Sequence, residues 1–114
     1  MSLGRAVALG CILAITVALP VWADVIDGHW CYPDGKRLSI QGPIIITPSG
    51  TRTEGGYSRH FFSYVIPPGD PDAGQTVSMA LVNEETVHLR IGATPSYSFD
   101  GPMEVWHRCG PPTS

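Results

Sequence analysis

Cysteine, basic charge and helical periodicity are all scarce in this chain of 114 residues. It has three cysteines and seven Lys and Arg residues against ten Asp and Glu residues, while glycines number 13 and prolines 11. The acidic balance argues against nucleic acid and anionic membrane surfaces as partners, because both require a basic face. The frequent glycines and prolines argue against a long amphipathic helix beyond the first 23 residues, since both residue types interrupt helices.

The longest apolar run stands at the N-terminus and has the form of a secretory signal peptide. Arg5 is the only charged residue before position 24, an apolar stretch follows it, and Val-Trp-Ala closes the segment at 21–23. Small or compact residues at such positions are typical of a signal peptidase site. We therefore expect residues 1–23 to be a signal peptide, residues 24–114 to form a single β domain, and the protein to be periplasmic or secreted.

Two alternatives for this segment are an uncleaved membrane anchor and a lipid attached to Cys11. The apolar run is short beside the ~20 residues of a membrane span, and it continues well past Cys11, so we disfavour both. Without the first 23 residues the chain has six basic and ten acidic residues, a net charge of −4. This charge is ordinary for a soluble exported domain, and we expect no membrane contact after cleavage.

Two cysteines remain after the signal peptide, Cys31 and Cys109. In an oxidising compartment an even pair predicts a disulfide, and a domain of this size often needs such a staple. A histidine precedes each cysteine by two residues, His29 and His107, so the reduced set would supply two thiolates and two imidazoles for zinc. Export favours the disulfide, and we expect neither a metal nor another cofactor.

Short segments of alternating or β-branched sequence predict an all-β fold. Turn signals such as Pro-Asp-Gly at 33–35 and Pro-Ser-Gly at 48–50 separate them. We expect a small antiparallel barrel or sandwich of six to seven strands with one disulfide. The expected strands are 29–32, 37–40, 44–47, 56–66, 77–81, 87–91 and 103–109.

The clearest pair of strands is 77–81 and 87–91, joined by a short polar connection. Their alternation predicts an antiparallel hairpin with Arg90 on the solvent face. Residues 67–74 and 94–102 read as long exposed loops, and the last five residues as a frayed tail. The residues expected on the core face of the hairpin are Val77, Met79, Leu81, Val87, Leu89 and Ile91.

Gly28-His29-Trp30 on the first expected strand resembles the Gly-x-Trp motif of lipocalin-type small β-barrels. Arg108, near the end of the last expected strand, stands where those barrels have an arginine that stacks on the tryptophan. The resemblance rests on this motif and this arginine, and it implies a barrel in which Arg108 packs on Trp30. More loosely, the chain looks like small exported proteobacterial proteins that have an all-β fold and one disulfide.

The densest polar and aromatic cluster consists of Tyr57, Arg59, His60 and Tyr64. Tyrosine and arginine are frequent anchors of binding surfaces, so these four residues are the candidate binding site. The alternative is an ordinary strand with one exposed face. The two long loops are the next candidates, because rigid β scaffolds often carry function on their loops.

No recognisable catalytic motif accompanies these residues: the strand-elbow pattern Gly-x-Ser-x-Gly is missing, and so is the EF-hand pattern. Asp70, Asp72 and Asp100 are possible calcium ligands, although solvated loop acids are the simpler interpretation. We therefore expect a non-catalytic exported binding or interaction module, not an enzyme, whose partner is an exported protein or a small ligand. The alternative is a protein inhibitor of a cell-wall or other exported hydrolase, because a small disulfide-bonded β protein presents a preorganised loop.

Overall fold

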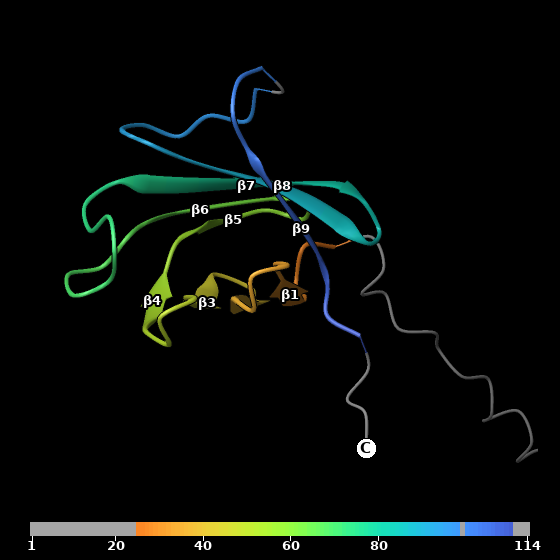
Figure 1. Cartoon of the computed structure of the whole chain (residues 1–114), viewed down its shortest axis with the longest axis horizontal. Coiled ribbons are helices and arrows are strands. Elements are labelled where there is room, and N and C mark those ends of the chain that lie inside the picture. The colour runs from red at the N-terminus through yellow and green to blue at the C-terminus, as the bar shows by residue number, and fades with distance from the viewer. Residues whose placement is uncertain (1–24, 99, 111–114) are drawn as a thin grey trace, which may run out of the picture.

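The computed structural model describes residues 25–98 and 100–110, so the predicted signal peptide, Cys11 and the last four residues lie outside the described residues. Within the described ranges the chain forms nine antiparallel strands in one sheet and no helix (Figure 1). The strands are β1 Gly28–Cys31, β2 Arg37–Gln41, β3 Ile44–Ile46, β4 Arg52–Glu54, β5 Gly56–Tyr57, β6 Phe61–Val65, β7 Thr76–Asn83, β8 Thr86–Gly92 and β9 Glu104–Arg108.

The sheet rolls into a nearly closed barrel. The strand order is β4-β3-β2-β1-β9-β8-β7-β6-β5, so β1 pairs with both β2 and β9 and joins the two ends of the domain. The two edge strands, β4 and β5, follow each other in the chain with only Gly55 between them. In Figure 1, β1, β3 and β4 face β5, β6 and β7 across the interior. The predicted all-β antiparallel architecture is thereby confirmed as a barrel.

Gly55 forms the corner at which the barrel comes closest to closing. Its N–H donates to the carbonyl of Pro43 at 2.9 Å. A Cβ at this position would overlap the carbonyl oxygen of Ser63 and stand 2.8 Å from the ring of Phe62. The chain therefore passes from β4 to β5 so close to β6 that only glycine fits without a shift of the backbone.

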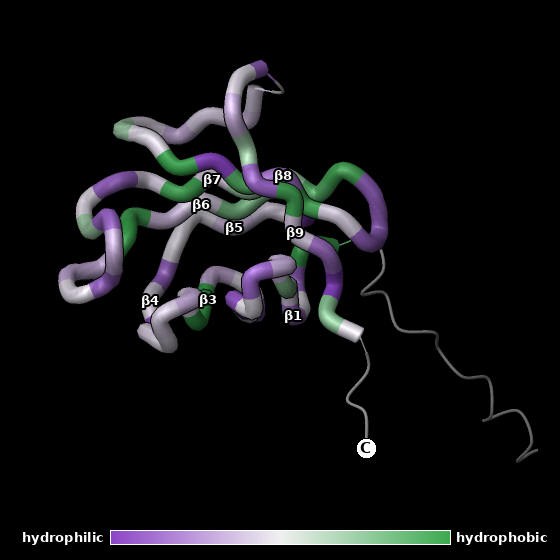
Figure 2. Tube along the Cα trace, in the orientation of Figure 1, coloured by the Kyte–Doolittle hydropathy of each residue, from purple (hydrophilic) through white to green (hydrophobic). Residues whose placement is uncertain are grey.

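The alternation of apolar residues along the strands produces one core inside the barrel. In Figure 2 hydrophobic residues are spread along the strands, whereas the β7–β8 turn is coloured hydrophilic. Trp30 and Trp106 are the largest fully buried side chains, and they come from the adjacent strands β1 and β9. The other core residues are Ile26, Leu38, Ile40, Ile45, Phe62, Tyr64, Ile66, Val77, Met79, Val87 and Leu89.

The described part of the chain has more strands than the predicted six to seven. Residues 56–66, predicted as one long strand, form a hairpin in which β5 and β6 flank a turn at 58–60. In that turn the N–H of Ser58 donates to the carbonyl of Phe61 at 2.9 Å. β4 and β5 have only three and two residues, which is too short for an alternating pattern to reveal them.

The β7–β8 hairpin forms in the predicted register, with Met79 opposite Leu89. Two of the six predicted core residues are less buried than expected: Ile91 is 43% exposed, and Leu81 packs against the core only partly buried. Ile91 lies near the end of β8, where the barrel opens, and Leu81 borders the register shift before Asn83. The prediction that both residues lie on the inward face of the hairpin was therefore right, but neither side chain is fully buried.

The connection between β8 and β9 folds back over the outside of the barrel. Arg90 points outward as predicted, but it is not simply solvated, because its guanidinium donates to loop carbonyls that include Ser98 at 2.6 Å and Pro102 at 3.0 Å. The N–H of Ser96 also donates to the hydroxyl of Ser78 at 2.9 Å. Ser78 is only 2% exposed although it lies on the outward face of β7.

Candidate functional site

The structure divides the predicted binding cluster between the two ends of the barrel. Tyr57 lies in the short edge strand β5, and Arg59 and His60 belong to the turn that follows. Tyr64 lies four residues beyond that turn, on the inward face of β6, and is 5% exposed. The first three residues are thus close to one another, whereas Tyr64 faces the interior.

Hydrogen bonds tie the first three residues to neighbouring segments. The carbonyl of Arg59 accepts the N–H of Ile26, and that of His60 accepts a backbone N–H of β7, both at 2.8 Å. The Tyr57 hydroxyl donates to the carboxylate of Asp27, and this hydrogen bond raises the pKa of Tyr57. The turn therefore joins β5 and β6 to the segment that leads into β1.

The contact between arginine and tryptophan that the lipocalin resemblance implies is present at the same end. The guanidinium carbon of Arg108 lies 4.4 Å from the centre of the Trp30 ring. The guanidinium donates to the carbonyls of Val25 at 2.8 Å and Asp27 at 2.9 Å, and the indole N–H of Trp30 donates to the carbonyl of Ile26 at 2.9 Å. Burial lowers the pKa of Arg108. These contacts fasten the end of β9 to β1 and to the segment that leads into it.

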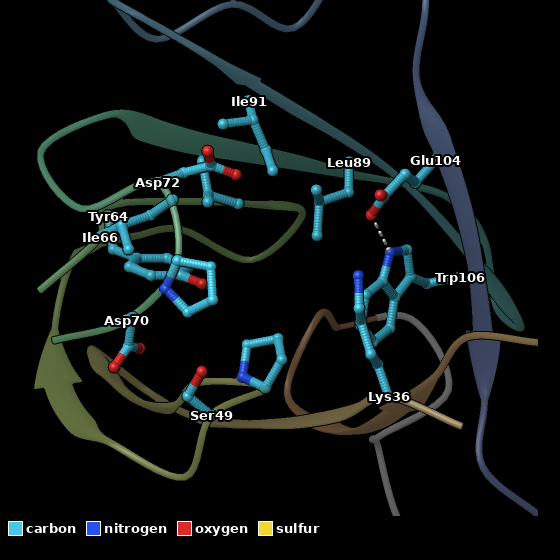
Figure 3. A pocket seen from close by; sticks show the side chains of 13 residues that line it. Lys36, Ser49, Tyr64, Ile66, Asp70, Asp72, Leu89, Ile91, Glu104 and Trp106 are labelled. Atoms are coloured by element: carbon cyan, nitrogen blue, oxygen red, sulfur yellow. Dashed lines mark hydrogen bonds between the residues drawn. The ribbon is translucent and has the colours of Figure 1, made fainter. Parts of the chain in front are cut away.

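The opposite end of the barrel contains a cavity of about 180 Å³ (Figure 3). Strands β6 to β9 supply its wall, and the β1–β2, β3–β4 and β6–β7 connections surround its mouth. The apolar wall consists of Ile66, Val77, Leu89, Ile91 and Trp106, together with the ring of Tyr64. The residues of the rim are Lys36, Pro48, Ser49, Asp70, Pro71, Asp72 and Glu104.

Tyr64 supplies a polar group to this apolar wall, and its hydroxyl points into the cavity in Figure 3. The hydroxyl makes no hydrogen bond to another of the residues that the structure describes. Burial, followed by the charges of Asp70 and Glu104, raises the pKa of Tyr64 to about 12. The hydroxyl is therefore neutral at ordinary pH and is available to a ligand or to water.

The mouth of the cavity is held in shape by Asp70. Its two carboxylate oxygens accept the hydroxyls of Thr47 and Thr51, each at 2.7 Å, so the β6–β7 loop is fastened to the β3–β4 turn. The N–H of Ile66 also donates to the carbonyl of Gln75 at 2.8 Å, which closes the base of the β6–β7 loop. The rim is thus preorganised by side-chain and backbone hydrogen bonds.

On the other side of the cavity lies an aromatic stack. The rings of Trp106 and Tyr32 are 5.1 Å apart between centres and inclined by 27°, and the ammonium of Lys36 lies 5.9 Å from the centre of the Tyr32 ring. The ammonium also pairs with the carboxylate of Asp34 at 3.4 Å. The indole N–H of Trp106 donates to Glu104 at 3.0 Å. The positive charge of Lys36 is therefore matched locally by Asp34.

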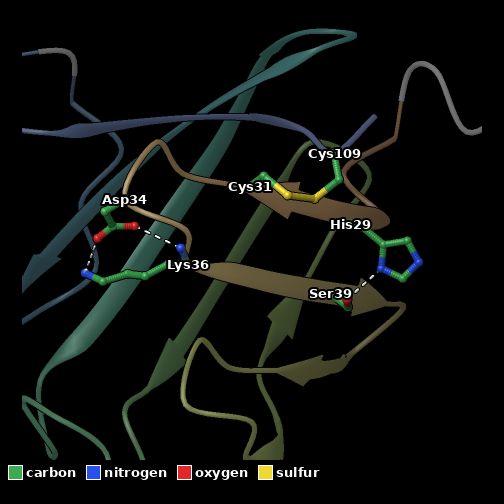
Figure 4. Close-up of a disulfide and its surroundings, with 6 residues drawn as sticks. All are labelled: His29, Cys31, Asp34, Lys36, Ser39 and Cys109. Atoms are coloured by element: carbon green, nitrogen blue, oxygen red, sulfur yellow. Dashed lines mark hydrogen bonds and ion pairs between the residues drawn. A yellow bond between two sulfur atoms is a disulfide. The ribbon is translucent and has the colours of Figure 1, made fainter. Parts of the chain in front are cut away.

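Cys31 and Cys109 form the predicted disulfide, with their Cα atoms 5.1 Å apart (Figure 4). Because the two sulfurs are bonded to each other, they are not the thiolates that the zinc alternative requires. His29 lies on the exposed face, where its Nδ1 is 2.6 Å from the hydroxyl of Ser39. In the described part of the chain, no group of three or more His, Cys, Asp and Glu side chains is placed to hold a metal ion.

Most of the cavity was not recognised in the sequence, where Tyr64 was a binding candidate, Asp70 and Asp72 were possible calcium ligands, and residues 67–74 were a possible functional loop. In an antiparallel meander every second connection lies at the same end of the sheet. Among the strands predicted from the sequence, the turns at 33–35 and 48–50 are the first and third connections and the loop at 67–74 is the fourth, so this count places the loop at the opposite end from the two turns. The three meet around one opening because residues 56–66 form a hairpin, which adds one reversal of the chain.

Comparison with protein-family models, with curated proteins and with solved structures gave no match for this chain. Among the described residues, no helix has the length and apolar character needed to cross a membrane.

Proposed function

We propose that this protein is a non-catalytic exported binding module that takes a small ligand in the cavity at the open end of its barrel. The observation that carries the proposal is the Tyr64 hydroxyl, which lies in a nine-tenths buried side chain, points into the cavity and has no hydrogen-bond partner among the described residues. The hydroxyl oxygen itself is accessible from the cavity, so it can bind a ligand or a water that a ligand displaces.

The size and shape of the cavity support a ligand smaller than most drug molecules. The cavity measures about 180 Å³, and an engineered apolar cavity of roughly 150 Å³ binds benzene. The mouth of the cavity is surrounded by the β6–β7 loop, and a ligand would enter there, at the opposite end from the Arg108–Trp30 contact.

Export and the lack of catalysis are parts of the same proposal. The Cys31–Cys109 disulfide is compatible with an oxidising compartment, and the predicted signal peptide supplies the route. The residues that line the cavity include neither histidine nor cysteine. The carboxylate of Asp70 is engaged by two threonine hydroxyls, so it is not poised as a general base.

The proposal is tested by screening small molecules for stabilisation of the exported protein in thermal melts, with a blocked variant alongside. Ile91→Trp fills the mouth from β8, whereas Val65→Trp is the matched control, because Val65 is 59% exposed and is not part of the cavity lining. Ligands that stabilise the wild type and Val65→Trp but not Ile91→Trp support the proposal. Ligands that stabilise all three equally place binding elsewhere, and a screen without any ligand contradicts the proposal.

The β6–β7 loop favours one second candidate, a protein inhibitor of an exported hydrolase. This loop is exposed at its tip and is held by Asp70 and by the hydrogen bond between Ile66 and Gln75. A preorganised loop loses little entropy when it docks into an active-site cleft. Inhibition of a muramidase or a protease by the wild type, lost when residues 68–73 are replaced by a Gly-Ser linker, would favour this candidate over small-ligand binding.

A further inference from the structure

We infer that the ligand of the cavity is a small organic amine, whose ammonium group meets the Tyr64 oxygen and the acidic rim while its apolar body packs against Trp106. This inference rests on the proposed small-ligand function and narrows it to one chemical class. It follows from three properties of the cavity: the sign of the charge at its rim, the hydrogen-bonding capacity of the Tyr64 hydroxyl, and the apolar character of its wall.

The charge at the rim is negative. Asp70, Asp72 and Glu104 are the acids that line the cavity, and Lys36 is the only basic residue among the lining residues. The ammonium of Lys36 is 3.4 Å from the carboxylate of Asp34, which does not line the cavity, so that acid offsets its charge. An excess of carboxylates at the mouth of a cavity with apolar walls attracts a cation and repels an anion.

The hydroxyl of Tyr64 lies within this negative field. Burial, together with the charges of Asp70 and Glu104, keeps it protonated by raising its pKa to about 12. A phenol oxygen can accept a hydrogen bond, and an ammonium group has three donors and no acceptor. A carboxylate ligand would also receive a hydrogen bond from this hydroxyl, but only against the repulsion of the rim. The site therefore favours a donor with positive charge.

The wall suits the apolar part of such an amine. Trp106 and Leu89 are 1% and 3% exposed, and with Val77 and Ile66 they surround the space beside Tyr64. Trp106 is held on its other side by stacking with Tyr32, so the indole is a fixed surface. A cavity of about 180 Å³ accommodates one aromatic ring with a short side chain.

A bare metal cation fits these residues less well than an organic cation. Both oxygens of Asp70 already accept threonine hydroxyls, and one oxygen of Glu104 accepts the indole N–H of Trp106. In the ranges 25–98 and 100–110 the acids do not come together as a metal-binding group. The remaining negative charge is spread around an apolar opening, which suits a cation that carries its own hydrophobic group.

The test compares three probes that share one body and differ in the charge of the head group: 2-phenylethylamine, 2-phenylethanol and 3-phenylpropanoate. Titration calorimetry of the exported protein at pH 7 should show the amine binding about tenfold more tightly than the alcohol, and the carboxylate more weakly than either. Equal affinity for amine and alcohol, or preference for the carboxylate, would overturn this inference and leave the proposed function intact. If none of the three binds, the inference is overturned, and the thermal screen decides the fate of the proposed function separately.

Two variants test whether the preference for the amine over the alcohol arises at the cavity. Asp72→Asn removes one rim charge, and asparagine tolerates the left-handed backbone of this position, where φ is 66°. Glu54→Gln is the matched control, because it removes the same charge from an exposed strand residue that does not line the cavity. The ratio of amine to alcohol affinity should fall severalfold in Asp72→Asn and stay unchanged in Glu54→Gln. An equal fall in both variants would reduce the preference to the net charge of the protein and contradict the inference.

Tyr64→Phe tests the hydroxyl with little change in shape. The variant should bind the amine about tenfold more weakly or worse, as expected for one lost hydrogen bond to a charged group. A melting temperature close to that of the wild type at pH 7 would show that the fold is kept. Unchanged affinity for the amine in a folded Tyr64→Phe variant would remove Tyr64 from the site.

Discussion

Single polar residues of this barrel fasten together segments that are far apart in the chain. Arg108 bonds to the carbonyls of Val25 and Asp27, which are 83 and 81 residues away. Asp70 bonds to Thr47 and Thr51, 23 and 19 residues away. The guanidinium of Arg108 donates to carbonyl oxygens and the carboxylate of Asp70 accepts threonine hydroxyls, and these hydrogen bonds offset the cost of removing the charges from water.

Tyr64 predicts a specific dependence of stability on alkaline pH. Its pKa is raised from 10.0 to about 12 in the folded protein, so the folded state holds the phenol proton more tightly than the unfolded chain does. This contribution is fully present below pH 10 and is lost as the pH rises towards 12. The full rise in pKa from 10.0 to about 12 amounts to about 2–3 kcal/mol. Denaturant unfolding of wild type and Tyr64→Phe between pH 8 and pH 11.5 checks this, because the variant should lose less stability. Parallel curves would contradict the raised pKa.

Arg108 depends on its planar guanidinium and not on charge alone. Arg108→Lys keeps the positive charge but cannot both cover the Trp30 ring and donate to two carbonyls, so we expect a loss of about 1–2 kcal/mol. Arg37→Lys is the control, since Arg37 is exposed at the start of β2, and it should change stability by less than about 0.5 kcal/mol. Urea unfolding of both variants gives the comparison, and equal effects would refute a special role for Arg108.

At the scale of elements, the β7–β8 hairpin contributes to the core, to the cavity and to the packing of the β8–β9 connection. Its inward face supplies the core and part of the cavity, and its outward face is covered by the connection that leads to β9. Arg90 holds that connection through carbonyls of the loop. The hairpin is therefore enclosed on both faces, although its sequence alternates in the manner of a strand with one solvated face.

Leu89 tests the inward face of this hairpin. It is 3% exposed, and Leu89→Ala should cost about 2–4 kcal/mol, as large-to-small core changes do. Val65→Ala on the outside of β6 should cost less than about 1 kcal/mol, because Val65 is 59% exposed. Chemical unfolding of the two variants measures both values. A larger loss for Val65→Ala would mean that the assigned faces are reversed.

At the scale of the whole molecule, two features bring the barrel close to closure: the disulfide and the tight corner at Gly55. The disulfide joins β1 to the end of β9, and Gly55 allows β4 to continue directly into β5. The first device connects the two ends of the domain, and the second lets the two edge strands follow one another at a tight corner. The short length of both edge strands also limits pairing with other chains.

Gly55→Ala should destabilise the barrel, because the added methyl group would overlap the carbonyl of Ser63 and the ring of Phe62. We expect a loss of about 1–3 kcal/mol, the usual cost of overpacking. Gly56→Ala is a matched control one residue away, where the nearest atom would be the Ser63 hydroxyl at 3.4 Å. Thermal melts should show a clear drop for the first variant only. A tolerated Gly55→Ala would mean that the corner is looser than the structure indicates.

The Cys31–Cys109 disulfide should decide whether the domain is folded at growth temperature. It closes a loop with a sequence separation of 78, for which the chain-entropy model gives about 4–5 kcal/mol, a large share of the roughly 5–10 kcal/mol of such domains. A thiol assay on unfolded, unreduced protein should find neither cysteine free. Reduction should then lower the melting temperature markedly. An unchanged melting temperature would contradict the stabilising role.

The amino-acid sequence by itself determined the all-β class, the facing of the β7–β8 hairpin and the pairing of Cys31 with Cys109, because alternation, turn residues and cysteine number are local or countable. It also contained the partners of the Trp30–Arg108 contact. Only the tertiary structure decided that Tyr64 faces a cavity at the opposite end from the turn at 58–60. Strand curvature, the tight corner and the meeting of distant turns depend on packing between segments that no local pattern encodes.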